Sequence, residues 1–457
     1  MGGHIEHATI AQSGEKPYQL PIKRLAFYNR MRIAEASHPE KGTCYLFFYQ
    51  NQFLTGKYTS IKKGSMLSKA FRKGIVVDAP HPLIDALFTP SQTLQLRTVT
   101  QLFKTLSKQL TPQETVYILS HFDSFVSKEK ITEAAKSFFF QYRRSGQFRM
   151  AYQVLITLLD ADPKNQWAHE LSQHMDYLKY RLIYEGSFSE MKTADPLHAE
   201  VLCMKKGKAS FKSLQKLLAE QKRWMDQAAQ YIHYFKNEKE PAPELYEEFS
   251  KLLAARFTAS ERAVILWDSC RGLMRDAKAR QDLVEALMSD GRLEDAAAVL
   301  MDSDECRAEQ LITLLSDPAF DYKKLDEEKL QQFILSMEDQ RECGRMLKII
   351  IPNMLKHQDF AAVLNWLHPI PSLMTENFKK MAAYQDDPEQ QLALGRLYHE
   401  MKQYQKAIDC FSWEMELNPS NPEPVQWLSK TYKEMGMAQE AKAYMGILQT
   451  MQKASNG

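Results

Sequence analysis

The residues with the most evident chemistry form a basic, aromatic window near the start of the chain. No acidic residue lies between Glu40 and Asp78, and tyrosine and phenylalanine rings alternate with the cations of this window. Cations among aromatic rings can follow a phosphate backbone and stack bases, so the window is a candidate nucleic-acid surface. The alternatives are a solvated face over an aromatic core, or a face that docks on an acidic part of the same chain, and we favour these. The predicted basic patch consists of Lys57, Lys62, Lys63, Lys69, Arg72 and Lys73.

No constellation of residues predicts catalysis. Gly207-Lys208 lacks the upstream glycine of a phosphate-binding loop. The acids Asp302, Asp304 and Glu305 lack the glycine and the closing glutamate of a calcium loop. No zinc-protease, nucleophile-elbow or dinucleotide pattern is present. We therefore expect no enzyme, no catalytic residue, no metal site and no cofactor.

The composition is that of a globular, mainly helical chain. Hydrophobic residues make up 44% and charged residues 25% of 457 residues, which is enough for a core. Only 17 glycines and 19 prolines are present, which favours long helical runs. The six cysteines lack metal-ligand spacing, and no apolar run approaches 18 residues. These features predict a reduced, cytoplasmic protein without a membrane span.

The net charge of +2 hides an asymmetry. Residues 1–113 hold 15 Lys and Arg against 6 Asp and Glu, a net of +9, so the remainder carries −7. This division suggests an acidic partner for the first part, or docking of the two parts on each other.

The first part of the chain is expected to contain a small basic α+β module. We expect a flexible tail over 1–21, a module over 22–88 that begins with a short basic helix at 22–35, and a helical repeat region over 89–457. Aromatic-rich strands at 44–49 and 53–58 predict a hairpin, and 74–78 predicts a third strand. Beyond Phe88 we expect helices alone, including one over 94–110 and one that Thr111 caps.

The C-terminal part repeats itself. Leu394, Tyr398, Ala407 and Phe411 recur 34 residues later as Leu428, Tyr432, Ala441 and Met445. A period of this length is typical of stacked helical hairpins. Gly146, Gly291 and Gly436 each precede a small alanine by five residues, where the turn between paired helices needs a permissive backbone.

This pattern resembles the tetratricopeptide repeat (TPR) family, in which Leu-Gly-x-x-Tyr is followed by Ala, an aromatic residue and Pro. Here these positions read Leu394, Gly395, Tyr398, Ala407, Phe411 and Pro419. The best repeats cover 132–165, 277–310, 388–421 and 422–453. The resemblance implies a mainly α fold, an irregular α-solenoid of helical hairpins.

Such arrays bind a partner peptide or protein in a groove lined by the first helix of each pair. The resemblance implies a non-enzymatic interaction scaffold or regulator. The alternative is a nucleic-acid-associated factor whose basic module binds the polymer while the repeats recruit a partner. A repeat-containing regulatory phosphatase is less favoured, because no acidic-amide catalytic group can be assigned. The expected groove residues are Gln391, Arg396, His399, Gln426 and Lys430.

Overall fold

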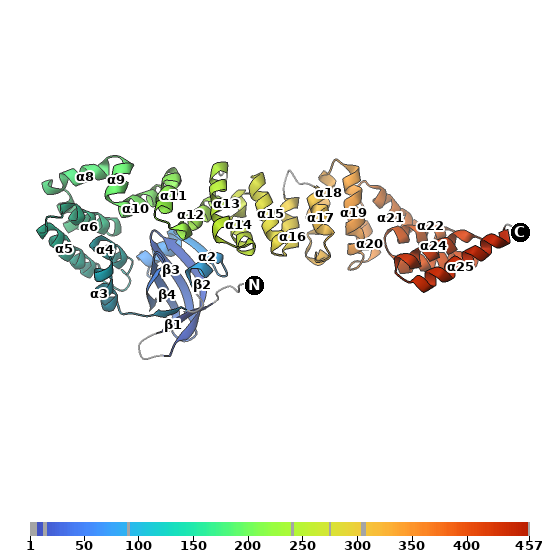
Figure 1. The fold of residues 1–457 in the computed structure, drawn as a ribbon, viewed down its shortest axis with the longest axis horizontal. Helices are drawn as coiled ribbons and strands as arrows, with labels where there is room; N and C mark the ends of the chain where they lie inside the picture. The colour runs from blue at the N-terminus through green and yellow to red at the C-terminus, as the bar shows by residue number, and fades with distance from the viewer. Residues whose placement is uncertain are drawn as a thin grey trace. The chain divides into compact units, whose positions relative to one another are not determined.

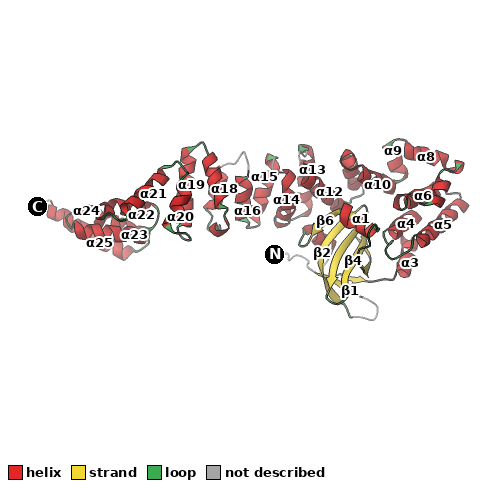
Figure 2. Cartoon of the chain, turned by 180° about the vertical axis from the view of Figure 1, so that it is seen from behind, coloured by secondary structure: helices red, strands yellow, loops and turns green. Residues whose placement is uncertain are grey.

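The computed structural model describes residues 7–11, 16–88, 92–238, 242–273, 276–302 and 308–455. The chain divides into two compact units, 1–279 and 280–457. The first unit combines a β-sheet with helices. The described residues of the second unit form helices and the turns that connect them (Figures 1 and 2). The end of the expected module at residue 88 lies inside the first unit.

The sheet of the first unit has the strand order β5-β4-β3-β2-β1-β7, and β6 pairs with β2. All of its pairings are antiparallel except β1 with β7. The sheet is nearly closed, because Thr55 donates to the carbonyl of Arg97 (2.8 Å) and the hydroxyls of Tyr18 and Tyr58 lie 2.8 Å apart. The strands are β1 (His7–Ala11), β2 (Tyr18–Tyr28), β3 (Met31–His38), β4 (Gly42–Tyr49), β5 (Gln52–Tyr58), β6 (Ile75–Asp78) and β7 (Thr93–Gln95).

Two expectations for this region are wrong. The expected tail over 1–21 contains β1 and the start of β2, and the expected helix over 22–35 is β2 and β3. A register shift between Ile22 and Arg24 interrupts the alternation of buried and exposed residues. Beyond it, Leu25, Ala26 and Phe27 are all buried, so the apolar spacing mimics a helix. Backbone pairing with β3 and β6 stabilises the strand instead.

The other local expectations have mixed outcomes. The hairpin of β4 and β5 and the strand β6 are confirmed. The capping box of Thr111 is also confirmed. The helix expected over 94–110 begins only at Val99, since Leu94 is buried in β7, and β7 also shows that strands are not confined to 44–78.

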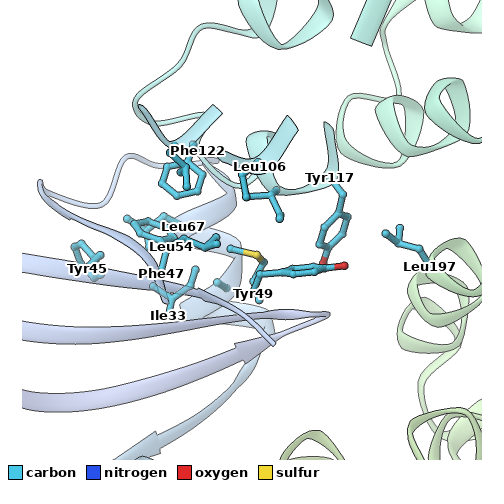
Figure 3. Close-up of a cluster of buried hydrophobic side chains, with 14 of the residues drawn as sticks. Ile33, Tyr45, Phe47, Tyr49, Leu54, Leu67, Leu106, Tyr117, Phe122 and Leu197 are labelled. Carbon is cyan, nitrogen blue, oxygen red and sulfur yellow. The ribbon is translucent and has the colours of Figure 1, made fainter. Parts of the chain in front are cut away.

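The sheet packs against the helices of its own unit through one apolar cluster (Figure 3). Ile33 and Phe47 of the sheet, Leu106 of α3, Tyr117 of α4 and Leu197 of α10 belong to it. Such a cluster removes a large apolar area from water, which stabilises the docked arrangement. The helices of this unit are α1 (Met66–Lys73), α2 (Pro82–Leu87), α3 (Val99–Gln109), α4 (Pro112–Ser120), α5 (Lys128–Arg144), α6 (Phe148–Ala161), α7 (Gln166–Ser172), η1 (Met175–Tyr177), α8 (Leu178–Glu185), α9 (Phe188–Ala194), α10 (Pro196–Lys206), η2 (Gly207–Ser210), α11 (Phe211–Glu220), α12 (Trp224–Asn237), α13 (Pro243–Arg256) and α14 (Ala259–Leu273).

The second unit continues with helical hairpins, and its boundary with the first falls within α15. The pairs α22–α23 and α24–α25 form the tandem repeat that the sequence predicts. The helices are α15 (Ala277–Ser289), α16 (Leu293–Met301), α17 (Ala308–Leu315), η3 (Tyr322–Lys324), α18 (Glu327–Ser336), α19 (Gln340–Met354), α20 (Phe360–Leu367), α21 (Leu373–Tyr384), η4 (Pro388–Gln390), α22 (Gln391–Glu400), α23 (Tyr404–Leu417), α24 (Pro422–Glu434) and α25 (Ala438–Ser455).

The expected glycine turns are confirmed. Gly146, Gly291 and Gly436 have φ of 73°, 75° and 80°, a region that favours glycine. Lys402 and Lys222 adopt the same conformation, with φ of 56° and 57°. In all five turns the amide of the next residue donates to the carbonyl five residues earlier, at 2.8–3.0 Å. The pair α11–α12 is therefore a further hairpin of the same kind, which the sequence pattern did not predict.

The small alanines generate the first prediction. Ala407 is fully buried between α22 and α23, where Gly395 already lies close to Phe411. We expect Ala407→Leu to lower the free energy of unfolding by about 1–3 kcal/mol through overpacking. Ala441→Leu should cost less, because α25 is the last described helix and its Met445 is exposed. Thermal melting measures both changes.

The control for this prediction is Gln405→Leu, on an exposed position of the same helix. It should change stability by no more than about 0.5 kcal/mol. If Ala407→Leu and Gln405→Leu both melt at the wild-type temperature, then α22 does not pack closely on α23 at Ala407.

Candidate functional site

The first helices of the tandem repeat, α22 and α24, bring three of the five expected groove residues to one side chain, Trp427. The Lys430 ammonium lies 4.4 Å and the Arg396 guanidinium 6.0 Å from the indole centroid. The His399 ring meets the indole edge to face at 5.1 Å. We call these four residues the Trp427 surface. Helical spacing explains the proximity, since residues three apart on α22 and on α24 share a face.

The charges of the Trp427 surface are balanced by acidic neighbours. Arg396 forms an ion pair with Glu423. His399 Nε2 lies 3.4 Å from a carboxylate oxygen of Glu434, without hydrogen-bond geometry. Burial lowers the pKa of His399, although Glu434 opposes this effect. The imidazole is therefore neutral at pH 7, and the two cations face two carboxylates.

The other two expected groove residues do not join this surface. Gln391 donates to the carbonyl of Asp387 at 2.9 Å, and Gln426 is exposed next to Trp427 in the sequence. Trp427 itself was missed by the sequence reasoning. The signal was available, because a tryptophan stands between two expected groove positions, Gln426 and Lys430. Trp427 is half-buried, and its inner side stacks on Phe411 with centroids 5.8 Å apart.

A surface of this composition can bind a protein segment. An aromatic ring that is half-exposed and flanked by cations offers apolar contact, hydrogen bonds and a cation–π partner. Among the described residues no group of three or more His, Cys, Asp or Glu has the geometry of a metal site. No helix in the described part of the chain is long and apolar enough to cross a membrane.

Comparison with protein families matches one model, that of the tetratricopeptide repeat, over residues 391–421. These residues are the α22–α23 hairpin, which carries Arg396 and His399. The chain is a TPR-like helical repeat protein. The hairpins α5–α6, α11–α12, α15–α16 and α24–α25 share the turn geometry described above.

Comparison with curated proteins gives no match. Among solved structures, the crystal structure of the P58(IPK) TPR domain is 16% identical, with a TM-score of 0.16, and the match covers 70% of this chain and 92% of that one. The structure of Naa15/Naa10 bound to HypK-THB is 13% identical, with a TM-score of 0.17, and the match covers 77% of this chain and 60% of that one.

In the first unit of the TPR-like chain, the cations of the expected basic patch differ in their local contacts. Lys57 donates to the carbonyl of Arg97 at 3.2 Å, and burial lowers its pKa. Lys62 donates to the carbonyl of Ser124 at 3.4 Å. Lys63 and Arg72 are exposed, and the half-buried Lys69 and the exposed Lys73 line a cavity. The six cations thus have three different environments.

The sheet docks on the TPR-like helices through buried ions outside this patch. Arg30 donates to a Glu200 carboxylate oxygen at 2.8 Å, and Arg223 donates to the same oxygen at 2.5 Å. Arg32 and Arg223 both donate to one oxygen of Asp226, each at 2.8 Å. All five side chains are less than a tenth exposed. We call them the docking network.

The docking network is held together by charge. Burial raises the pKa of Glu200, but Arg223 and Arg30 outweigh it and hold the pKa below its usual range. The network contains three guanidinium groups and two carboxylates, and a further carboxylate, Glu114, lies 4.0 Å from Arg30. The buried ion pairs between the sheet and the helices are thus made by arginines, and the lysines of the predicted patch are not members of the docking network.

The docking network generates the second prediction. Glu200→Gln keeps the shape of the side chain but leaves the Arg30 and Arg223 charges buried without their carboxylate. Removing one partner of a buried pair costs about 3–5 kcal/mol. We therefore expect a loss of this size in the free energy of unfolding at pH 7, measured with urea. Glu220→Gln, at an exposed ion pair with Lys192, should cost about 0–1 kcal/mol.

The same substitution should alter the pH dependence of stability. The pKa of Glu200 is lower in the folded chain than its unfolded value of about 4.3. Its contribution is therefore fully present above the unfolded pKa and is lost as the pH falls through the folded pKa. Wild type should lose more stability below pH 4.3 than Glu200→Gln does. Parallel pH profiles for the two proteins would contradict this.

Proposed function

We propose that this chain is a non-enzymatic protein-interaction scaffold whose C-terminal repeats bind a partner peptide or protein at the Trp427 surface. The observation that supports this proposal is the convergence of Arg396, His399 and Lys430 on one half-exposed indole. Tryptophan and arginine are the side chains that most often dominate binding energy at protein interfaces. The indole is also supported from beneath by Phe411, so little conformational freedom is lost on binding.

The charge balance indicates which partner chemistry fits. Arg396 and Lys430 are offset by Glu423 and Glu434, so the surface has no net charge to select a strongly acidic segment. Apolar contact with the indole therefore supplies most of the affinity, and the flanking ions fix orientation. The proposed partner is a protein segment that places an apolar or aromatic side chain on Trp427.

The nucleic-acid alternative has less support. Lys57 and Lys62 are engaged by backbone carbonyls, and Lys69 and Lys73 face a cavity instead of an extended groove. Polymer binding needs several cations along one path, because each neutralised phosphate contributes separately. No observation on the described residues favours this alternative over protein binding.

The third prediction tests the Trp427 surface. Trp427→Ala should abolish capture of the partner when the full chain is used as bait in native extract, because the indole is the proposed anchor. Trp413→Ala is the matched control, since Trp413 lies on the second helix of the same repeat pair and is 51% exposed. Quantitative mass spectrometry compares the proteins retained by wild type and each variant, with and without nuclease.

Equal capture by Trp427→Ala and wild type would contradict the proposal. Capture that nuclease removes would favour the nucleic-acid alternative. Thermal melting of each variant shows that it is folded. Lys430→Glu, which leaves the indole in place, provides a second variant and should weaken capture by a smaller factor.

A further inference from the structure

A cavity of about 640 Å³ lies within the first unit, between the sheet module and the helices. Its walls come from the end of β2, from α1 and α4, and from α10, η2 and α12. Cavities of 300–1,000 Å³ are the usual size for small-molecule sites. The Trp427 surface belongs to the other unit, so this cavity is independent of the proposed function.

The cavity has a positive lining. Lys69 and Lys73 of α1, with Lys205 and Lys208, line it, against the carboxylates Asp160 and Glu238. Counting histidine as neutral, this gives a net charge of +2. Lys205 is paired with Asp160 at 2.7 Å and Lys208 with Glu238 at 2.6 Å. The surplus charge therefore belongs to the two lysines of α1.

Lys69 and Lys73 lie four residues apart and so share one face of α1. Within the described residues neither forms a salt bridge with a carboxylate. Lys69 lies near enough to Asp123 for their charges to interact, but both oxygens of Asp123 accept from the amide of Met66 at 3.0–3.1 Å. Two lysines that share a face and line a cavity can bind a doubly charged anion.

A second, independent observation comes from His121, which lines the same cavity and is 1% exposed. Burial lowers its pKa to about 4, so the ring is neutral at pH 7. Nδ1 lies 2.9 Å from the carbonyl of Tyr117, which can only accept, so Nδ1 carries the hydrogen. Nε2 is therefore an acceptor, and no described protein atom donates to it. Nε2 itself has almost no accessible surface, so the ring contributes a neutral part of the wall and the positive charge of the lining stays with the lysines.

We propose that this cavity binds a phosphorylated small molecule, with the phosphate on Lys69 and Lys73. Aromatic side chains of the wall, including Phe27 and Tyr28, provide apolar contact for the rest of the molecule. Nucleotides and sugar phosphates share this chemistry, and the experiment distinguishes them.

The test is isothermal titration of the full chain with AMP, ribose 5-phosphate, adenosine and inorganic phosphate. At least one of the two organic phosphates should bind, and adenosine should bind at least about tenfold more weakly, since hydrogen bonds to charged groups are worth about 1.5–3 kcal/mol each. The double variant Lys69→Gln/Lys73→Gln should weaken that binding at least about tenfold for the same reason.

The matched control is Lys62→Gln/Lys63→Gln, which removes two exposed lysines of the same segment that do not line the cavity and should leave the affinity unchanged. The proposal is overturned if neither organic phosphate binds, if the Lys69/Lys73 variant binds as wild type does, or if inorganic phosphate binds as tightly as the organic phosphates.

Discussion

The arrangement of the first unit depends on the buried contact between Arg30 and Glu200. This contact joins the β2–β3 turn to α10, two segments 170 residues apart in sequence. Moving both ions out of water carries a large desolvation cost, and their attraction offsets it only where the geometry is good. The arginine is held by further groups, since its backbone amide also donates to the Tyr117 hydroxyl at 3.1 Å. If the sheet docked elsewhere on the helices, these charges would be buried and unpaired. The docking network therefore specifies where the sheet docks.

The network does not satisfy all of its members. Oε1 of Glu200, Nε of Arg32 and one terminal nitrogen of Arg223 are buried without a partner among the described residues. Apolar contact must therefore supply much of the stability of the junction, and the cluster around Phe47 and Tyr117 does so. The two kinds of contact therefore have different roles. Burial of apolar area favours association of the sheet with the helices but does not depend on their relative orientation. The buried ions make other orientations unfavourable, because a displaced sheet would leave charges buried without a partner.

The features that could be predicted from the sequence are those that depend on local residue types. The 34-residue period, the glycine turns and the capping box at Thr111 each depend on residues close in sequence. The strands β2 and β3 were missed because the register shift in β2 gives its apolar residues a helix-like spacing, whereas backbone pairing with the neighbouring strands decides the conformation. The α11–α12 hairpin was missed because it has neither marker: Lys222 occupies the turn, as Lys402 does in α22–α23, and Gln227 stands five residues later, where the predicted repeats have alanine. A lysine can adopt this conformation at a modest cost that the surrounding hairpin offsets.

The candidate sites follow the same rule. Three of the five residues expected in the groove lie together around Trp427, since helix periodicity fixes which side chains share a face, and their role in binding stays a prediction. The basic patch was predicted as a single surface. The sequence could not show which of its cations contact a backbone carbonyl or line a cavity, because this depends on where β5, α1 and the intervening loop lie against other segments.

The docking network and the cavity are linked by their positions along the chain. Tyr28 and Asn29 line the cavity and immediately precede Arg30, and Val201, also in the wall, follows Glu200. The ion pair that fixes the junction therefore also fixes two parts of the cavity wall that come from distant segments of the chain. A site whose walls are held in this way is pre-organised, so a ligand entering it loses little free energy to rearrangement of the protein. The buried ions, which add little net stability, thus give the cavity a defined shape.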